Sequence, residues 1–331
     1  MAVVTDIESL NWQKMVAPYS QPSVRKSVWQ LLNTLVPFAL MWAALLYSVQ
    51  ISYWLTLLLA IPTAGLQMRT FVLFHDCCHR SFFRSRRANE VAGVLLGFLT
   101  FTPFYQWGHD HAIHHATAGD LDRRWVGDVP TMTVDEFRAA SWTKRTGYRI
   151  LRSPWILFTV GPTIMFVIVQ RFWPSHAGRR ERWSVVYTNL ALLATFAVMS
   201  LLFGAGRYVA ALLPVTMLAT ALGVWGFYVQ HQFEGVYWAR REQWNFVRAG
   251  LQGSSYYDLP AVLRWFTASI GFHHIHHLSP RIPNYLLAKC HRDNPALQIK
   301  PMTILASLKS ARLRLVDDRT FQLVGYDALR R

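Results

Sequence analysis

The sequence predicts an all-α integral membrane protein, with four transmembrane helices in two hairpins and with re-entrant or interfacial helices under a cytoplasmic histidine-rich cap. Three observations lead to this fold class. Hydrophobic residues make up 52% of the 331 residues and gather in long blocks. Basic residues gather beside those blocks. Most of the 13 histidines fall into four short clusters.

Four stretches are long and apolar enough to cross a bilayer, because a spanning helix needs about 20 predominantly apolar residues. They cover residues 31–49, 52–74, 184–203 and 207–229. Two shorter apolar stretches, 91–106 and 155–172, have basic or polar residues on both sides. We therefore expect these two to be re-entrant or interfacial, so that each enters and leaves on the same face of the membrane.

The basic residues orient the spans. Arginines follow the second and fourth spans, whereas Arg207 is the only basic residue across the short links that close the two hairpins. Cytoplasmic segments of membrane proteins are enriched in Lys and Arg. Both termini and all the basic segments are therefore expected in the cytoplasm.

The formal net charge of +16 at pH 7 is also compatible with nucleic-acid binding. A basic cytoplasmic face beside anionic lipid explains the same charge. Because the apolar blocks already indicate a membrane protein, we expect membrane lipid, and no nucleic acid, as a partner.

The histidine clusters have the spacing of metal ligands. The first is His75 with His79, the second lies within 109–115, the third is His231 alone, and the last lies within 273–277. Helical residues three or four positions apart share a face, so a cluster can direct two or three ring nitrogens at one point. Imidazole binds iron, zinc and copper. The i, i+3, i+4 sets are His111, His114 and His115, and His273, His276 and His277. With His75, His79 and His231 they give nine ligands, which exceed one tetrahedral site and favour two metals.

The predicted topology brings these clusters to one face. His75 and His231 lie at the cytoplasmic ends of the second and fourth spans, and the other clusters lie in polar segments assigned to the same side. A single His-x-x-x-His pair is common without a metal, and a lone histidine at a helix end is more often a cap. Polar side chains near a bilayer are costly and tend to be functional, so clusters that share one face favour a metal centre.

The three boxes resemble the His-x-x-x-His, His-x-x-His-His and His-x-x-His-His set of membrane fatty acid desaturases. The first box, His75-Asp-Cys-Cys-His79, and the run from Gly271 to Tyr285 are similar to the acyl-lipid omega-6 (delta-12) branch. Residues 111–128, 228–234 and 253–257 are similar to bacterial members. The resemblance covers roughly residues 30–315. Fatty acyl hydroxylases and carotenoid ketolases share the triple-box pattern and stay open as alternatives.

The resemblance implies a membrane desaturase domain, residues 31–290, between cytoplasmic tails at 1–30 and 291–331. It implies an oxidoreductase that inserts a cis double bond into a fatty acyl lipid, with O₂ as co-substrate and two irons as cofactors. The implied location is the bacterial inner membrane. The implied iron ligands are His75, His79, His111, His114, His115, His231, His273, His276 and His277.

The electron source is expected to be a separate protein, because the sequence contains no flavin, nicotinamide or fused cytochrome motif. Ferredoxins are commonly acidic and the predicted cytoplasmic face is basic, so electrostatic steering favours a ferredoxin as donor. The double-bond position, the chain length and headgroup of the substrate, and the oligomeric state are not determined by the sequence.

Several residues beside the boxes are candidates for supporting roles. Asp76, Asp110 and Asp128 are the nearest candidates to orient ligand imidazoles, with turn or capping roles as the alternative. His109 is expected beside the ligands rather than among them, and His274 should point away from them on a helix. Cys77 and Cys78 are expected to pack near the site or beside the ligands, with soft-metal binding as the alternative.

One position differs from a related structural class, in which an Asn one turn before the lone histidine holds a water molecule. Phe227 occupies that position here. This leaves Gln230, Gln232 or no residue at all in the role.

Two classes of protein unrelated to desaturases are disfavoured. A metal transporter would need acidic or polar residues within its spans, and the four predicted spans contain no Asp, Glu or Lys. An intramembrane zinc protease would need His-Glu-x-x-His, but Asp76 stands in the glutamate position of the first box.

Overall fold

The structure is a computed structural model that describes residues 11–330, so part of the predicted tail at 1–30 lies outside the described residues. Within that range four helices are long and apolar enough to cross a membrane. These helices overlap the four predicted spans and confirm the predicted fold class. They are α2 (Val24–Ser48), α3 (Tyr53–Cys78), α9 (Arg179–Phe203) and α10 (Ala205–His231).

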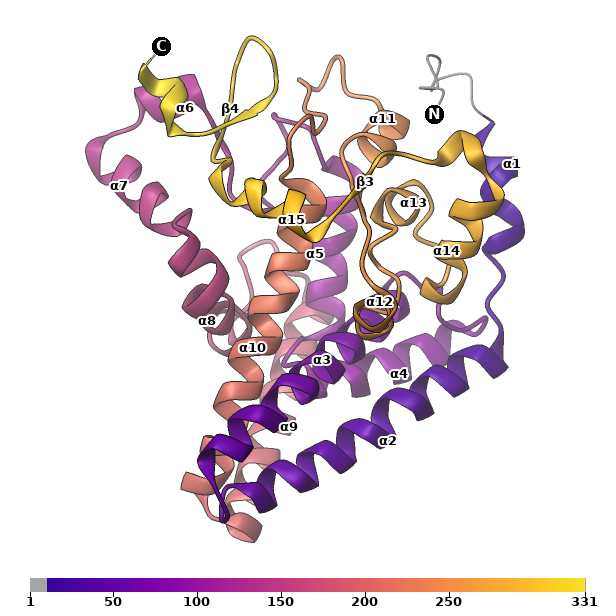
Figure 1. Ribbon diagram of the computed structural model, residues 1–331, viewed down its shortest axis with the longest axis vertical. Helices are drawn as coiled ribbons and strands as arrows, with labels where there is room; N and C mark the ends of the chain where they lie inside the picture. The colour runs from indigo at the N-terminus through magenta and orange to yellow at the C-terminus, as the bar shows by residue number, and fades with distance from the viewer. Residues whose placement is uncertain (1–10, 331) are drawn as a thin grey trace.

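The four helices form two hairpins whose turns lie at the end of the molecule farthest from α13 (His273–Leu278) (Figure 1). In the first turn, Ser48 and Thr56 share a buried hydrogen bond of 2.8 Å between their hydroxyl groups. In the second turn, Gly204 alone separates α9 from α10 and has a φ of +84°. Side chains with a Cβ rarely adopt that conformation, which explains the glycine at this reversal.

The helices extend beyond the predicted apolar stretches. The first begins at Val24, and its first turn includes the basic residues Arg25 and Lys26. The second continues past residue 74 to Cys78, and the fourth continues to His231. Hydropathy reports only the apolar part of a helix, whereas Arg, Lys and His are compatible with helical backbone. These extensions carry the first and third histidine clusters on the ends of the two spanning helices.

Neither shorter apolar stretch is a straight span. Residues 91–106 are divided between α4 (Arg86–Leu99) and α5 (Phe104–Thr117), with Phe101 in the left-handed region at φ +58° between them. Residues 155–172 contain η2 (Ile156–Val160), α8 (Gly161–Val167) and η3 (Val169–Arg171). This segment is bent by 54° relative to α7 (Trp142–Leu151), as a re-entrant segment or a broken span would be.

The cap consists of short elements that lie at the opposite end from the hairpin turns (Figure 1). Its strands are β1 (Met132–Thr133), β2 (Tyr256–Tyr257), β3 (Pro301–Met302), β4 (Leu315–Val316) and β5 (Leu323–Val324). They form a three-stranded sheet, in which β1 is parallel to β4 and β4 is antiparallel to β5, and a parallel pair of β2 with β3. The cap helices are α1 (Trp12–Val16), η1 (Ala17–Tyr19), α6 (Val134–Ala139), α11 (Phe246–Leu251), α12 (Ala261–Phe266), α13 (His273–Leu278), α14 (Asn284–Asp293), η4 (Pro295–Leu297), α15 (Ile304–Ser307), η5 (Leu308–Arg312) and η6 (Tyr326–Arg330).

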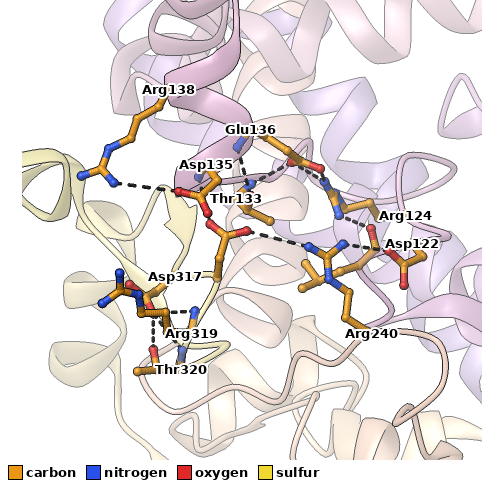
Figure 2. A network of polar contacts seen from close by, with 12 residues as sticks. Asp122, Arg124, Thr133, Asp135, Glu136, Arg138, Arg240, Asp317, Arg319 and Thr320 are labelled. Atoms are coloured by element: carbon orange, nitrogen blue, oxygen red, sulfur yellow. Dashed lines mark hydrogen bonds and ion pairs between the residues drawn. The ribbon is translucent and has the colours of Figure 1, made fainter.

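Ion pairs join the distant segments of the cap (Figure 2). Arg124, whose side chain is 3% exposed, pairs with Glu136. The same carboxylate accepts a 2.8 Å hydrogen bond from the backbone N–H of Thr133 and completes a capping box at the start of α6. Arg240 bonds Asp122 at 2.8 Å and lies 3.8 Å from Asp318. The loop after α5, the segment after α10 and the C-terminal hairpin are therefore tied together.

We expect the substitution Glu136→Gln to destabilise the cap by about 1 kcal/mol. Glutamine still serves in a capping box, so the change mainly removes the carboxylate from the buried Arg124. The measurement is the thermal unfolding midpoint of the detergent-solubilised protein. Asp135→Asn is the control, because that carboxylate is 73% exposed and 3.9 Å from Arg138. Equal midpoints for the two variants would contradict the expectation.

Candidate metal centre

The first histidine pair is carried by the end of α3. His75 lies in the last turn and His79 is the C-cap residue, and their ring centroids are 4.7 Å apart. Leu73 and Phe74, in the turn before, are fully buried in the largest apolar cluster of the described chain. Helical positions four apart share a face. Packing of that turn therefore fixes the direction in which both imidazoles point.

Helix α5 supplies three histidines from a single face. His111, His114 and His115 have the i, i+3, i+4 spacing, and Trp107, one turn earlier, stacks on His111 with centroids 4.3 Å apart and an interplanar angle of 21°. The indole ring covers one face of this imidazole and limits its rotation. Helix α5 thereby presents its ligand-bearing face in a fixed orientation toward the end of α3.

The third box and the lone histidine are joined through the backbone of Ser255. Its N–H donates to the carbonyl of Gln230 at 3.0 Å, and its carbonyl accepts from the N–H of His274 at 3.3 Å. Gln230 precedes His231 at the end of α10, and His274 lies in α13. All six residues of α13 are buried. This backbone link sets the position of α13 relative to α10.

The nine predicted ligands converge in two adjacent groups. Five histidines offer ring nitrogens within 4.8 Å of one another, and three others do the same. His273 adjoins the second group, because its Nε2 lies 2.9 Å from Nε2 of His231. His115 and His277 stack between the groups with centroids 4.1 Å apart. The first group is His75, His79, His111, His115 and His276, and the second is His114, His231 and His277.

The donor set fits metal ions better than it fits a hydrogen-bonded core. Nε2 of His115 lies 3.1 Å from Nε2 of both His111 and His276, and one proton cannot serve three such nitrogens. Nε2 of His79 and Nε2 of His277 are buried without a hydrogen-bond partner among the described residues. A buried polar atom without a partner costs about 1–3 kcal/mol. A cation between the nitrogens removes this cost.

The protonation state also suits metal binding. Burial lowers the pKa of His111, His115 and His276 well below the ordinary value, and the neighbouring histidines lower it further. The same holds for His273 and His277. These imidazoles are therefore neutral at physiological pH, as metal ligands must be.

The family model described as fatty acid desaturase matches residues 52–302, which include all nine histidines. The chain belongs to the fatty acid desaturase family. This family consists of oxidoreductases that act on fatty acyl chains, and membership disfavours the transporter and protease alternatives.

Named relatives support the same assignment. A fatty acid desaturase from Bacillus subtilis is 43% identical over 318 residues, which cover 96% of this chain and 90% of the relative. An sn-1 oleoyl-lipid 12-desaturase from Synechocystis is 27% identical, over 67% of this chain and 63% of the relative. A chloroplastic omega-6 fatty acid desaturase from Arabidopsis thaliana is 26% identical, over 75% of this chain and 55% of the relative. These relatives do not favour the hydroxylase and ketolase alternatives.

The three aspartates beside the boxes take different partners in this desaturase. Asp128 Oδ1 lies 2.5 Å from Nδ1 of His114, as a carboxylate that orients a ligand imidazole would. Asp76 Oδ2 accepts hydrogen bonds from the backbone N–H and the side chain of Asn284 at 2.7 and 2.9 Å. Its Oδ1 lies 3.5 Å from Nδ1 of His75. Asp110 points away from the nine histidines, since it is bonded to Gln106 and to His176.

The remaining predictions near the site have mixed outcomes. His274 points away as predicted, and its Nε2 lies 3.1 Å from Nδ1 of His291. The expectation that His109 lies beside the ligands is wrong, because its side chain is exposed and lies in a separate group with His176. Adjacent helical positions point in different directions, and His111 already takes the inward one. Cys77 and Cys78 have no place in any of the candidate metal groups.

Phe227 packs against a cluster of buried apolar residues and borders the second histidine group. Its ring centroid lies 5.2 Å from those of both His114 and His231. Gln230 donates to the carbonyl of Ile270, and Gln232 bonds Arg152 and Thr131. Both glutamines are therefore engaged elsewhere, and an aromatic ring borders the second group.

Two contributors to the site were not identified from the sequence. Asn284 positions Asp76 from 208 residues away, and the carbonyl of Gly253 lies 3.2 Å from Nδ1 of His231. Asn284 lies within the run that ends at Tyr285 and that carried the family resemblance, so a signal was present. Gly253 acts through its backbone, which leaves no signature in residue type.

We expect Asp128→Ala to weaken the affinity of the histidine cluster for iron by about 10- to 100-fold, because it removes the carboxylate that orients His114. The measurement is iron retention against a chelator of known affinity. Asp327→Ala, which removes an exposed carboxylate from the C-terminal segment, is the control. An unchanged iron affinity in Asp128→Ala would contradict the expectation.

Proposed function

We propose that this desaturase inserts a cis double bond into the acyl chain of a membrane lipid at two irons held by nine histidines. The observation that supports this proposal is the convergence of nine imidazoles in two adjacent groups. The proposed ligands of one iron are His75, His79, His111, His115 and His276, and those of the other are His114, His231, His273 and His277. Two irons, when bound, activate O₂ with electrons supplied from outside.

The reaction consumes O₂, two electrons and two protons, and removes two hydrogens from neighbouring carbons of the substrate, with two waters as products. The protein's part is to hold the ligand imidazoles in place and to shield the site from water. Burial favours the neutral form of His111, His115, His273, His276 and His277. Asp128 orients His114. Trp107 covers His111, and Phe227 covers His114 and His231. Apolar walls keep bulk water away from the site in which an unactivated C–H bond must react.

An acyl chain of a membrane lipid is the proposed substrate. The cyanobacterial relative is named for action on an sn-1 oleoyl lipid. In this chain the histidine groups lie at the ends of α3 and α10, both candidate spans. An acyl chain anchored in the same bilayer can reach that depth without leaving the membrane.

We propose further that the protein lies in the bacterial inner membrane with both termini and the site on the cytoplasmic side. Two features support this orientation. Both hairpin turns are on the far side from the cap, and the basic segments of the chain lie in or beside the cap. The predicted division into a tail at 1–30, a membrane domain at 31–290 and a tail at 291–331 remains a prediction.

Expression in a bacterium that supplies a ferredoxin and its reductase should produce a new unsaturated fatty acid, detected by gas chromatography and mass spectrometry of the lipid extract. Purified protein should contain two irons per chain. His276→Ala should abolish the product and lower the iron content, because it removes a proposed ligand. His274→Gln, two positions earlier on the same helix, is the control and should retain both. A hydroxylated fatty acid or an oxidised carotenoid in place of a desaturated product would overturn the proposal.

We also propose an acidic ferredoxin as the electron donor. Arginines and lysines exceed acidic residues by 16 in the chain, and many of them lie in the cap. The rate at which reduced ferredoxin is oxidised by the desaturase should fall by about tenfold as ionic strength rises from about 0.05 to about 0.5 M, since salt screens steering between opposite charges. An uncharged small-molecule reductant is the control. A rate with ferredoxin that is insensitive to salt would contradict steering.

A further inference from the structure

A third group of metal-binding side chains lies outside the nine-histidine cluster. His109 and Asp110 belong to α5, and His176 belongs to the segment between η3 and α9. One potential ligand atom from each lies within 4.8 Å of the other two. Unlike the cluster, this group is open to solvent, with His109 and His176 exposed and Asp110 partly buried. The proposed desaturase reaction uses none of these three side chains.

The geometry of the group is set by Asp110. Its Oδ1 lies 3.0 Å from Nε2 of His176, and the ring of His176 lies 6.1 Å from the ring of His109. Positions 109 and 110 are adjacent on α5 and point in different directions. His176 reaches both because it comes from another segment of the chain.

A buried amide orients the carboxylate. Gln106, one turn before Asp110, is 7% exposed and donates from Nε2 to Oδ2 of Asp110 at 2.9 Å. This leaves Oδ1 turned toward His176. The Oε1 atom of the same amide is buried without a partner among the described residues. A carboxylate held on one oxygen by a buried donor, with its other oxygen facing two imidazoles, has the arrangement of a supported metal ligand.

We propose that His109, Asp110 and His176 form a divalent transition-metal site, best suited to Zn²⁺, that is separate from the nine-histidine cluster. Two imidazole nitrogens and one carboxylate oxygen are a common zinc donor set, and they leave a fourth tetrahedral position for water. Imidazole donors favour zinc over Mg²⁺ or Ca²⁺, which prefer oxygen ligands.

Nearby arginines do not occupy the site. Arg180 pairs with Glu90 at 3.0 Å, and Nε of Arg182 donates to the carbonyl of Ala177 at 2.8 Å. Their positive charge lowers cation affinity, but it is screened at this solvent-exposed position. The competing interpretation is a plain hydrogen bond between His176 and Asp110, and the experiment below separates the two.

A bound ion would join α5 to the segment that leads into α9. One contact already makes this connection, because the hydroxyl of Ser184 in α9 accepts from the backbone N–H of Gln106 at 3.1 Å. Helix α5 carries three of the nine clustered histidines. Zinc at this site would therefore stabilise the position of a ligand-bearing helix without entering the reaction, and the stabilisation would increase with zinc concentration.

The test uses full-length, iron-loaded protein in detergent, dialysed against buffered Zn²⁺ and analysed for both metals by mass spectrometry. Wild-type protein should bind one zinc more than His176→Asn, with equal iron in both. Gln106→Ala should weaken zinc binding by about tenfold, because it removes the donor that orients Asp110. Glu234→Gln, which changes an exposed acidic residue outside the group, should bind zinc as wild type does.

A spectroscopic readout makes the test independent of desaturase activity. Co²⁺ added to the zinc-free protein should give the visible absorption of a tetrahedral His/carboxylate site in wild type and not in His176→Asn, and Mg²⁺ should not displace it. Equal zinc and Co²⁺ binding in wild type and His176→Asn would overturn the proposal. So would a loss of one iron for each zinc bound, because zinc would then occupy the nine-histidine cluster.

Discussion

The structure depends on holding nine imidazoles from four ligand-bearing elements in one buried volume. Several pairs of their Nε2 atoms lie 2.9–3.2 Å apart. At that distance two N–H groups that point at each other would repel. Buried nitrogens that cannot bond one another are costly. The surrounding packing must therefore hold the rings in place, and cations shared between the nitrogens would make the arrangement favourable.

Three interactions fix the four ligand-bearing elements. The end of α3 is fixed by the buried Leu73 and Phe74, and α5 by the stacking of Trp107 on His111. Helices α10 and α13 are joined through the backbone of Ser255. Because α3 and α10 both carry histidines in their last turn, the depth of the site is set by where two spanning helices leave the membrane. A change in the length of either helix would move one histidine group relative to the other.

The spanning helices and the nine histidines could be predicted because each leaves a local signal. Hydropathy over about 20 residues marks a span, and i, i+3, i+4 spacing marks a set of imidazoles on one face. The partners of Asp76 and Asp128 leave no such local signal. Asp128 meets His114 because the loop after α5 reverses at Gly127, where φ is +71° and an added Cβ would lie 2.8 Å from the carbonyl oxygen of Asp110. Loop geometry of this kind depends on contacts that local patterns do not report. The position of His109 was predicted wrongly for a different reason, because His111 takes the inward direction on the same helix and positions 109 and 111 do not share a face.

The burial of the four spanning helices explains how α3 can be apolar overall and still carry charged and polar side chains. In α3 61% of the most apolar window is buried inside the protein, against 11% in α9. Most of the apolar surface of α9 is therefore left uncovered by the protein, whereas α3 is largely enclosed by it. Arg69 of α3 illustrates the consequence, because its guanidinium donates to Thr34 and Asn33 of α2 and lies 4.3 Å from the ring of Trp265. A charge is tolerated at membrane depth where neighbouring helices provide acceptors. The same protein surroundings allow α3 to carry His75, Asp76 and His79 at its end, which a helix exposed to lipid on all sides could not do.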